Sequence, residues 1–159
     1  MKRILLLFSV ATCLLFTSCD ENNPTDAVPY IPIAVQNKFV AASINGEAHM
    51  FDQTKVEKED LISSEGVPYT DLIVTANKKN DTSSQIKFRL EYLKTGTETC
   101  YYFLYQLGAA EFDIEDGNSF HVNVNQGKAN KIKGTFSGTL HDFEGNAITI
   151  SNGNFDIAF

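Results

Sequence analysis

The nine residues QIKFRLEYL, at positions 85–93, decide the fold because apolar side chains recur there at every second position. The apolar set runs from Ile86 to Tyr92, and three charged residues occupy the positions between. A period of two places alternate side chains on opposite faces of an extended chain. The pattern therefore predicts a β-strand with one face in a hydrophobic core and the other in water.

Comparable β-rich segments recur along the chain, and no segment shows a convincing helical period. They are Phe39–Ile44, Glu47–Asp52, Val67–Ala76, Thr99–Leu107, Phe120–Asn125, Lys131–Leu140, Ala147–Ser151 and Asn154–Phe159. Glycines punctuate the second half at short intervals, as in all-β domains. We therefore predict an all-β fold, an antiparallel β-sandwich or barrel of roughly eight to nine strands. A lipocalin-like barrel is the alternative architecture.

Two Asn-Gly pairs predict tight turns between strands. Asn-Gly supplies the two positive φ angles of a type I′ turn, so Asn45-Gly46 predicts a hairpin between the first two segments. Asn152-Gly153 predicts a second hairpin, which would pair Ala147–Ser151 with the C-terminal strand. The charged stretch Val56–Ser64 is expected to form a loop or one short turn of helix.

An apolar run near the N-terminus precedes these strands. Two basic residues open the chain, and the uncharged stretch Ile4–Phe16 follows. This run is shorter than the roughly 20 residues that span a bilayer as a helix. A basic start and a short apolar run are typical of a secretory signal peptide. We divide the chain into a signal peptide (1–18), a tether that holds three of the four prolines (19–37) and an all-β domain (38–159).

The end of the apolar run, Leu15-Phe16-Thr17-Ser18-Cys19, resembles the lipobox of bacterial lipoproteins, with Phe16 where a leucine is usual. The resemblance implies cleavage between Ser18 and Cys19. It also implies a diacylglyceryl thioether on the Cys19 sulfur and an acyl chain on its amino group. Two or three acyl chains anchor a protein stably in a membrane.

The acidic run that begins with Asp20-Glu21 resembles the surface-export signal of Bacteroidetes-type lipoproteins. In enterobacterial lipoproteins an aspartate at this position would instead indicate retention at the inner membrane. We expect an outer-membrane or cell-surface location, with the periplasmic side as the alternative. The membrane is then a partner through the lipid anchor.

Both ends of the domain resemble small Bacteroidetes lipoproteins of unknown function, which carry all-β domains of about this length behind a lipobox. The residues concerned are Phe39–Gly46, Gly134–Leu140 and Ile148–Phe155. These are turn and strand signatures, so the resemblance implies a fold and assigns no catalytic residue.

Composition and motifs argue against several classes of function. A net charge of -7 disfavours a nucleic-acid partner, because phosphate binding requires a basic surface. His49, His121 and His141 lack metal-ligand spacing, and no nucleophile elbow or nucleotide-binding loop is present. We therefore predict no enzymatic activity and no cofactor. Cys100 is the sole thiol left once Cys13 is removed with the signal peptide and Cys19 is acylated, and its apolar surroundings predict a buried hydrophobe.

Two segments are candidates for binding. The acidic residues Asp113, Glu115 and Asp116 are calcium-ligand candidates, although their alternation with apolar residues equally fits an exposed strand that ends in an Asp-Gly turn. In the aromatic segment Thr99–Leu107, the side chains Tyr101, Tyr102 and Tyr105 are glycan-stacking candidates, because a sugar's apolar face suits an aromatic ring. That segment also fits a strand covered on both faces.

Three classes of function remain open. The first is a membrane-anchored domain that binds an unidentified protein, glycan or envelope component. The second is a lipocalin-like carrier of a small apolar ligand, which requires an internal cavity. The third is a hydrolase of envelope polymers, which is disfavoured because no acid–base constellation can be named.

Overall fold

The alternating residues 85–93 begin within β5 of the computed structural model, which describes residues 38–114 and 120–159. In these two ranges the chain forms ten strands and no helix, so the all-β prediction is confirmed. The strands are β1 (Lys38–Ile44), β2 (Glu47–Phe51), β3 (Gln53–Ile62), β4 (Pro68–Lys78), β5 (Asp81–Glu91), β6 (Cys100–Leu107), β7 (Ala110–Asp113), β8 (His121–Lys128), β9 (Lys131–His141) and β10 (Ala147–Ala158). The predicted signal peptide and tether lie outside the described residues.

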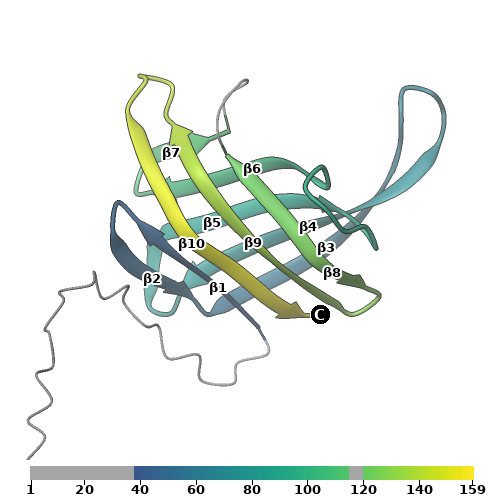
Figure 1. Cartoon of the computed structure of the whole chain (residues 1–159), viewed down its shortest axis with the longest axis horizontal. Helices are drawn as coiled ribbons and strands as arrows, with labels where there is room; N and C mark the ends of the chain where they lie inside the picture. The colour runs from purple at the N-terminus through teal and green to yellow at the C-terminus, as the bar shows by residue number, and fades with distance from the viewer. Residues whose placement is uncertain (1–37, 115–119) are drawn as a thin grey trace, which may run out of the picture. The chain divides into compact units, whose positions relative to one another are not determined.

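The strands pair into one antiparallel sheet that folds over itself into two layers (Figure 1). One layer holds β2, β1, β10, β9 and β8 in that order, and the other runs from β3 to β7. Asp52 alone separates β2 from β3, so the chain passes between the layers at this residue. Asp113 of β7 pairs with His141 of β9 and joins the layers a second time. This arrangement fits the predicted sandwich or barrel.

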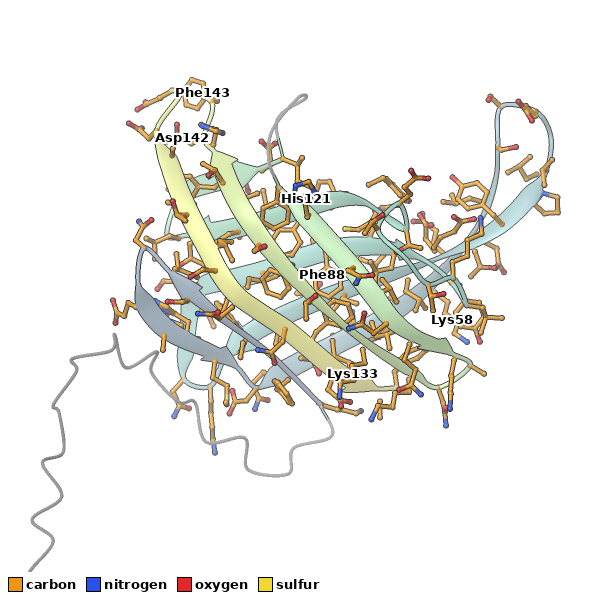
Figure 2. The ribbon with its side chains drawn as sticks, viewed as in Figure 1. Lys58, Phe88, His121, Lys133, Asp142 and Phe143 are labelled. Atoms are coloured by element: carbon orange, nitrogen blue, oxygen red, sulfur yellow. The ribbon has the colours of Figure 1, made fainter. Side chains whose placement is uncertain are left out.

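Aromatic side chains fill the space between the two layers. The ring centroids of Phe88 in β5 and Phe155 in β10 lie 5.2 Å apart. Those of Phe103 in β6 and Phe136 in β9 lie 5.0 Å apart. All four rings are buried, and each pair joins opposite layers. The inner face that residues 85–93 predict is therefore part of the core, with Phe88 at its centre (Figure 2).

The first Asn-Gly pair forms the predicted hairpin. Asn45 and Gly46 have φ angles of 50° and 86°, and β1 and β2 pair in register on either side of them. Asn45 also ties this turn to β10, because its side-chain oxygen accepts a hydrogen bond from the Thr149 amide at 2.9 Å.

The second predicted hairpin, at Asn152-Gly153, is wrong. Residues 147–158 form the single strand β10, which pairs with β9 on one side and β1 on the other. A register shift between Ile150 and Gly153 marks a bulge, and Asn152 has a φ of 52°. Asn-Gly serves a bulge as well as a turn, because both need positive φ. Any Cβ at Gly153 would lie 2.5 Å from the Phe136 ring, so the close packing requires glycine.

The prediction of a loop or helical turn at Val56–Ser64 is also wrong. Most of this stretch belongs to β3, which pairs with β4 from Gln53 to Ile62. β3 ends the order of paired strands, and most of its residues alternate between exposed and half-buried. Charged side chains are common on edge strands, where they discourage pairing with other chains. The charges at Val56–Ser64 are therefore compatible with a strand.

Candidate functional site

A groove of about 500 Å³ opens on the outer face of the layer that runs from β3 to β7. We call it the tyrosine groove, and its lining residues are Ser63, Glu65, Val67, Tyr69, Glu91 and Tyr101. The first three lie in or beside the turn between β3 and β4, and the others come from β4, β5 and β6. Segments far apart in the sequence therefore share this surface.

Strand alternation and register determine where Tyr69, Glu91 and the underlying Asp71 lie. Leu72 and Val74 point into the core and are fully buried, so the odd-numbered positions Tyr69 and Asp71 of β4 lie on the outer face. Glu91 of β5 pairs directly with Asp71 and brings a second carboxylate to the same face. The groove thus follows from the register between β4 and β5.

Tyr101 reaches the groove through a bulge in β6. Arg89 and Leu90 are consecutive in β5, but their partners in β6 are Tyr102 and Cys100. Tyr101 is the extra residue, and a bulge redirects the side chain that it carries. Tyr101 is 56% exposed, whereas Phe103 and Tyr105 further along β6 are buried. The bulge therefore places an aromatic ring at the surface.

A cluster of charged side chains with the buried Asp71 at its centre lies beneath Tyr101. The Tyr101 hydroxyl donates a hydrogen bond to Oδ2 of Asp71, whose side chain has no exposed surface. Arg89 Nη1 lies 3.7 Å from that oxygen and donates to Oε2 of Glu59 at 2.9 Å. Among residues 38–114 and 120–159, no group forms a hydrogen bond with Asp71 Oδ1. Burial raises the pKa of Asp71, the Arg89 charge opposes this shift, and Glu59 and Glu91 add to it.

These contacts define what the groove can do chemically. A sugar ring can stack on an exposed tyrosine whose hydroxyl is already held, because orientation by Asp71 reduces the entropy lost on binding. The carboxylates of Glu65 and Glu91 can accept hydrogen bonds from ligand hydroxyl groups. Asp71 itself is fully buried beneath the groove, so it positions Tyr101 and does not meet a ligand.

The three tyrosines predicted for glycan stacking lie in different environments. Tyr101 lines the groove, as described, while Tyr102 is half-buried, and burial together with Glu111 and Asp113 raises its pKa. The prediction for Tyr105 is wrong: this residue is 2% exposed and belongs to the core, so its ring cannot stack on an external sugar. Tyr69 was missed, although its alternation with buried residues of β4 is a signal for an outward-facing aromatic.

The predicted β6 segment is covered on both faces only at its centre. Phe103, Leu104 and Tyr105 are buried there, whereas Tyr101 and Leu107 are more than half exposed. The strand begins at Cys100, which is half-buried against the core, and burial raises its pKa to about 12. This thiol is therefore protonated at neutral pH and is a poor nucleophile.

Only one of the calcium candidates falls within the described residues. Asp113 ends β7, beside an acidic groove of about 840 Å³ that also includes Glu111, Asp142 and Glu144. In residues 38–114 and 120–159, no group of three or more metal-ligating side chains could hold an ion. Glu115 and Asp116 lie outside the described residues.

A third groove, on the opposite layer, has a different chemistry. It has a volume of about 470 Å³ and lies over β8, β9 and β10. Its lining is dominated by uncharged polar side chains and the exposed His121, and its phenylalanine, Phe136, is buried. This groove offers hydrogen bonds and an imidazole but no exposed tyrosine, which makes it a useful control for the tyrosine groove.

The chain matches no family model, no curated protein and no solved structure. In the part of the chain that the structure describes, no helix is long and apolar enough to cross a membrane. Ser18 and Cys19, the predicted cleavage and lipidation site, lie outside that part. The chemistry of the tyrosine groove therefore carries the functional interpretation of the domain.

Proposed function

We propose that this chain is a lipid-anchored protein of the outer membrane or cell surface whose β domain binds a glycan in the tyrosine groove. The observation that carries the proposal is the exposed Tyr101 ring, which a bulge presents and a buried Asp71 holds by its hydroxyl. An exposed aromatic fixed in this way, between acceptor carboxylates, is suited to polyhydroxylated ligands. A protein ligand that uses the same groove is the second possibility within this class.

The anchor part of the proposal rests on the N-terminal sequence. The apolar run, Ser18-Cys19 and the acidic Asp20-Glu21 together resemble a bacterial lipoprotein start. A tether with three prolines would hold the domain away from the membrane, since proline favours extended chain. A domain held at a surface in this way is well placed to capture a fixed partner.

The core supports surface binding over the two alternatives. A lipocalin-like carrier needs an internal cavity, but the rings of Phe88, Phe103, Phe136 and Phe155 occupy the centre of the domain. A hydrolase needs an acid and a base that reach the substrate. The carboxylate with the raised pKa, Asp71, is covered, so it does not supply that acid.

The anchor predicts a specific chemical state of the mature N-terminus. We expect mass spectrometry of the protein purified from its native membrane to show a chain that begins at Cys19 with two or three acyl chains. A Cys19→Ser variant removes the sulfur acceptor, so it should leave the membrane fraction, whereas Cys13→Ser should be processed normally. An unmodified Cys19 in the membrane-bound protein would contradict the anchor.

Glycan binding predicts a strong dependence on Tyr101. We expect Tyr101→Ala to weaken binding to envelope glycans by about tenfold, the equivalent of ~1.4 kcal/mol, because the stacking surface is lost. Tyr101→Phe keeps the ring and loses the hydrogen bond to Asp71, so it should fall between wild type and Tyr101→Ala. Glycan arrays followed by calorimetry on the mature chain would measure both variants.

Asn154→Ala in the groove over β8, β9 and β10 is the matched control. It removes a surface side chain from the opposite layer and should leave binding unchanged. If Asn154→Ala lost glycan binding and Tyr101→Ala retained it, the ligand would bind in the groove over β8, β9 and β10. That result would overturn the assignment of the tyrosine groove as the binding site.

A further inference from the structure

Six lysines gather at the end of the domain where the chain enters β1. Strand register brings three of them together: Lys38 pairs with Ile157, Ala158 pairs with Lys131, and Lys131 pairs with Lys128 across the β8–β9 turn. Lys133 follows on β9. These lysines, with Lys58 and Lys94, form what we call the lysine end.

Further contacts place Lys58 and Lys94 beside the β8–β9 turn. Lys58 Nζ lies 2.9 Å from the Tyr92 hydroxyl, which donates to the carbonyl of Ala129 in the β8–β9 turn at 3.2 Å. The backbone of Lys94 packs against Gly127, the residue before Lys128. The lysine end is thus assembled from four separate parts of the sequence.

Few carboxylates neutralise this surface. Asp156 Oδ1 lies 2.8 Å from Lys131 Nζ, and Asp156 Oδ2 lies 3.9 Å from Lys133 Nζ. The carboxylate of Glu91 forms an ion pair with Lys94. In the described part of the chain no carboxylate forms an ion pair with Lys38, Lys58 or Lys128. These three exposed ammonium groups give the end an excess of positive charge on a chain whose net charge is -7.

The opposite end of the domain is acidic. Figure 2 shows Asp142 and Phe143 at one end and Lys58 and Lys133 toward the other. Asp142 stabilises its turn, because its Oδ1 accepts hydrogen bonds from the amides of Glu144 at 3.0 Å and Asn146 at 2.8 Å. The adjacent groove adds the carboxylates of Glu111 and Asp113. The two charges are therefore separated along the domain.

We propose that the lysine end lies against anionic lipid headgroups when the chain is anchored, so that the acidic Asp142–Asn146 turn points away from the membrane. This orientation rests on the lipid anchor of the proposed function. The chain enters the domain at Lys38, within the lysine end, so a short tether keeps these lysines near the membrane at high effective concentration. Lysines near an anionic leaflet are attracted to it, and salt screens that attraction.

The test supplies the anchor chemically, so that it does not depend on acylation in cells. The Cys19 thiol of the unacylated mature chain is coupled to a maleimide-bearing lipid in vesicles. Cys100 should not compete, because its pKa is raised to about 12. Acetylation of each lysine by a water-soluble reagent is then followed by mass spectrometry. Vesicles of phosphatidylcholine alone are compared with vesicles that also contain phosphatidylglycerol.

We expect acetylation of Lys38, Lys58 and Lys128 to slow at least about tenfold on the anionic vesicles, a modest effect for three lysines at such a surface. Lys87, which lies opposite Thr75 and Leu104 within the other layer, should react equally on both vesicles, and salt should abolish the difference. The triple variant Lys38→Gln, Lys58→Gln, Lys128→Gln should remove the protection of Lys133. The variant Lys87→Gln removes a lysine outside the lysine end and should preserve it.

Equal reactivity of the lysine end on both vesicles would overturn this orientation, as would equal loss of protection in the triple variant and in Lys87→Gln. Displacement by inorganic phosphate at constant ionic strength would also overturn it, in favour of a site for the free anion. None of these outcomes depends on the mass of the native N-terminus. Failure of this inference and failure of the lipid anchor are therefore distinguishable.

Discussion

Replacing Phe88 with alanine is expected to lower the free energy of unfolding by about 3–5 kcal/mol, the usual cost of emptying a buried phenylalanine site. Phe88 has no exposed surface, and its ring stacks on Phe103 of β6 at 5.7 Å between centroids. Its contact with Phe155 of β10 links the two layers. Since domains are stable by only about 5–15 kcal/mol, this one change removes a large part of the total.

Urea unfolding followed by fluorescence measures the effect as a shift in the midpoint. Phe143→Ala is the matched control, because it makes the same chemical change at a side chain that is 98% exposed. We expect the midpoint of Phe143→Ala to stay close to wild type. A similar midpoint for both variants would contradict the role of Phe88 as the link between layers.

The role of Phe88 could be predicted because strand alternation is a local signal. Residues 85–93 show their inner face without reference to any other part of the chain, and β5 buries Ile86, Phe88 and Leu90 as expected. The hairpin at Asn45-Gly46 is local in the same sense. Fold class and most strands follow from such signals.

The two wrong predictions have a common physical cause. Both predictions, the hairpin at Asn152-Gly153 and the loop or helical turn at Val56–Ser64, rest on local sequence signals. The structures of both segments depend on neighbouring strands. β10 continues through its Asn-Gly pair because β1 and β9 hold it on both sides. β3 extends because β4 pairs with its whole length. Pairing with neighbouring strands therefore decided the structure of both segments.

The candidate site shows the same limit. Tyr101 could be proposed from the aromatic segment, but its bulge depends on register with β5. No local sequence pattern indicates that Asp71 and Arg89 belong to the site. The contact of Asp71 with Tyr101 and that of Arg89 with Glu59 each join residues 30 positions apart. A single sequence shows which side chains alternate, and it does not show which strand lies beside which.

Replacing Arg89 with methionine is expected to destabilise the domain by about 3 kcal/mol at neutral pH, near the lower end of the range for breaking a buried ion pair. Methionine keeps much of the side-chain length and removes the charge. Asp71, which is fully buried, would then lose its nearest cation and retain Glu59 and Glu91 as neighbouring carboxylates. The lower end applies because the Arg89 side chain is 31% exposed.

The double variant Arg89→Met, Asp71→Asn tests whether the buried charge causes that loss. Asparagine removes the uncompensated charge at nearly constant volume, so the double variant should recover much of the stability lost in Arg89→Met. The difference between the double variant and the sum of the single variants, measured by urea unfolding, gives the coupling energy. Additive effects would contradict the interaction between Arg89 and Asp71.

The pH dependence supplies an independent check with a definite sign. Burial raises the pKa of Asp71 above its ordinary value of 3.8, so the folded domain holds this proton more tightly than the unfolded chain. The stabilisation that this proton gives the folded state is present below the ordinary pKa of Asp71, 3.8, and it is lost as pH rises through the raised pKa. Without Arg89 the pKa rises further, so the loss caused by Arg89→Met should be smaller near pH 4 than near pH 7. A loss that is equal at both pH values would show that Arg89 acts through packing alone.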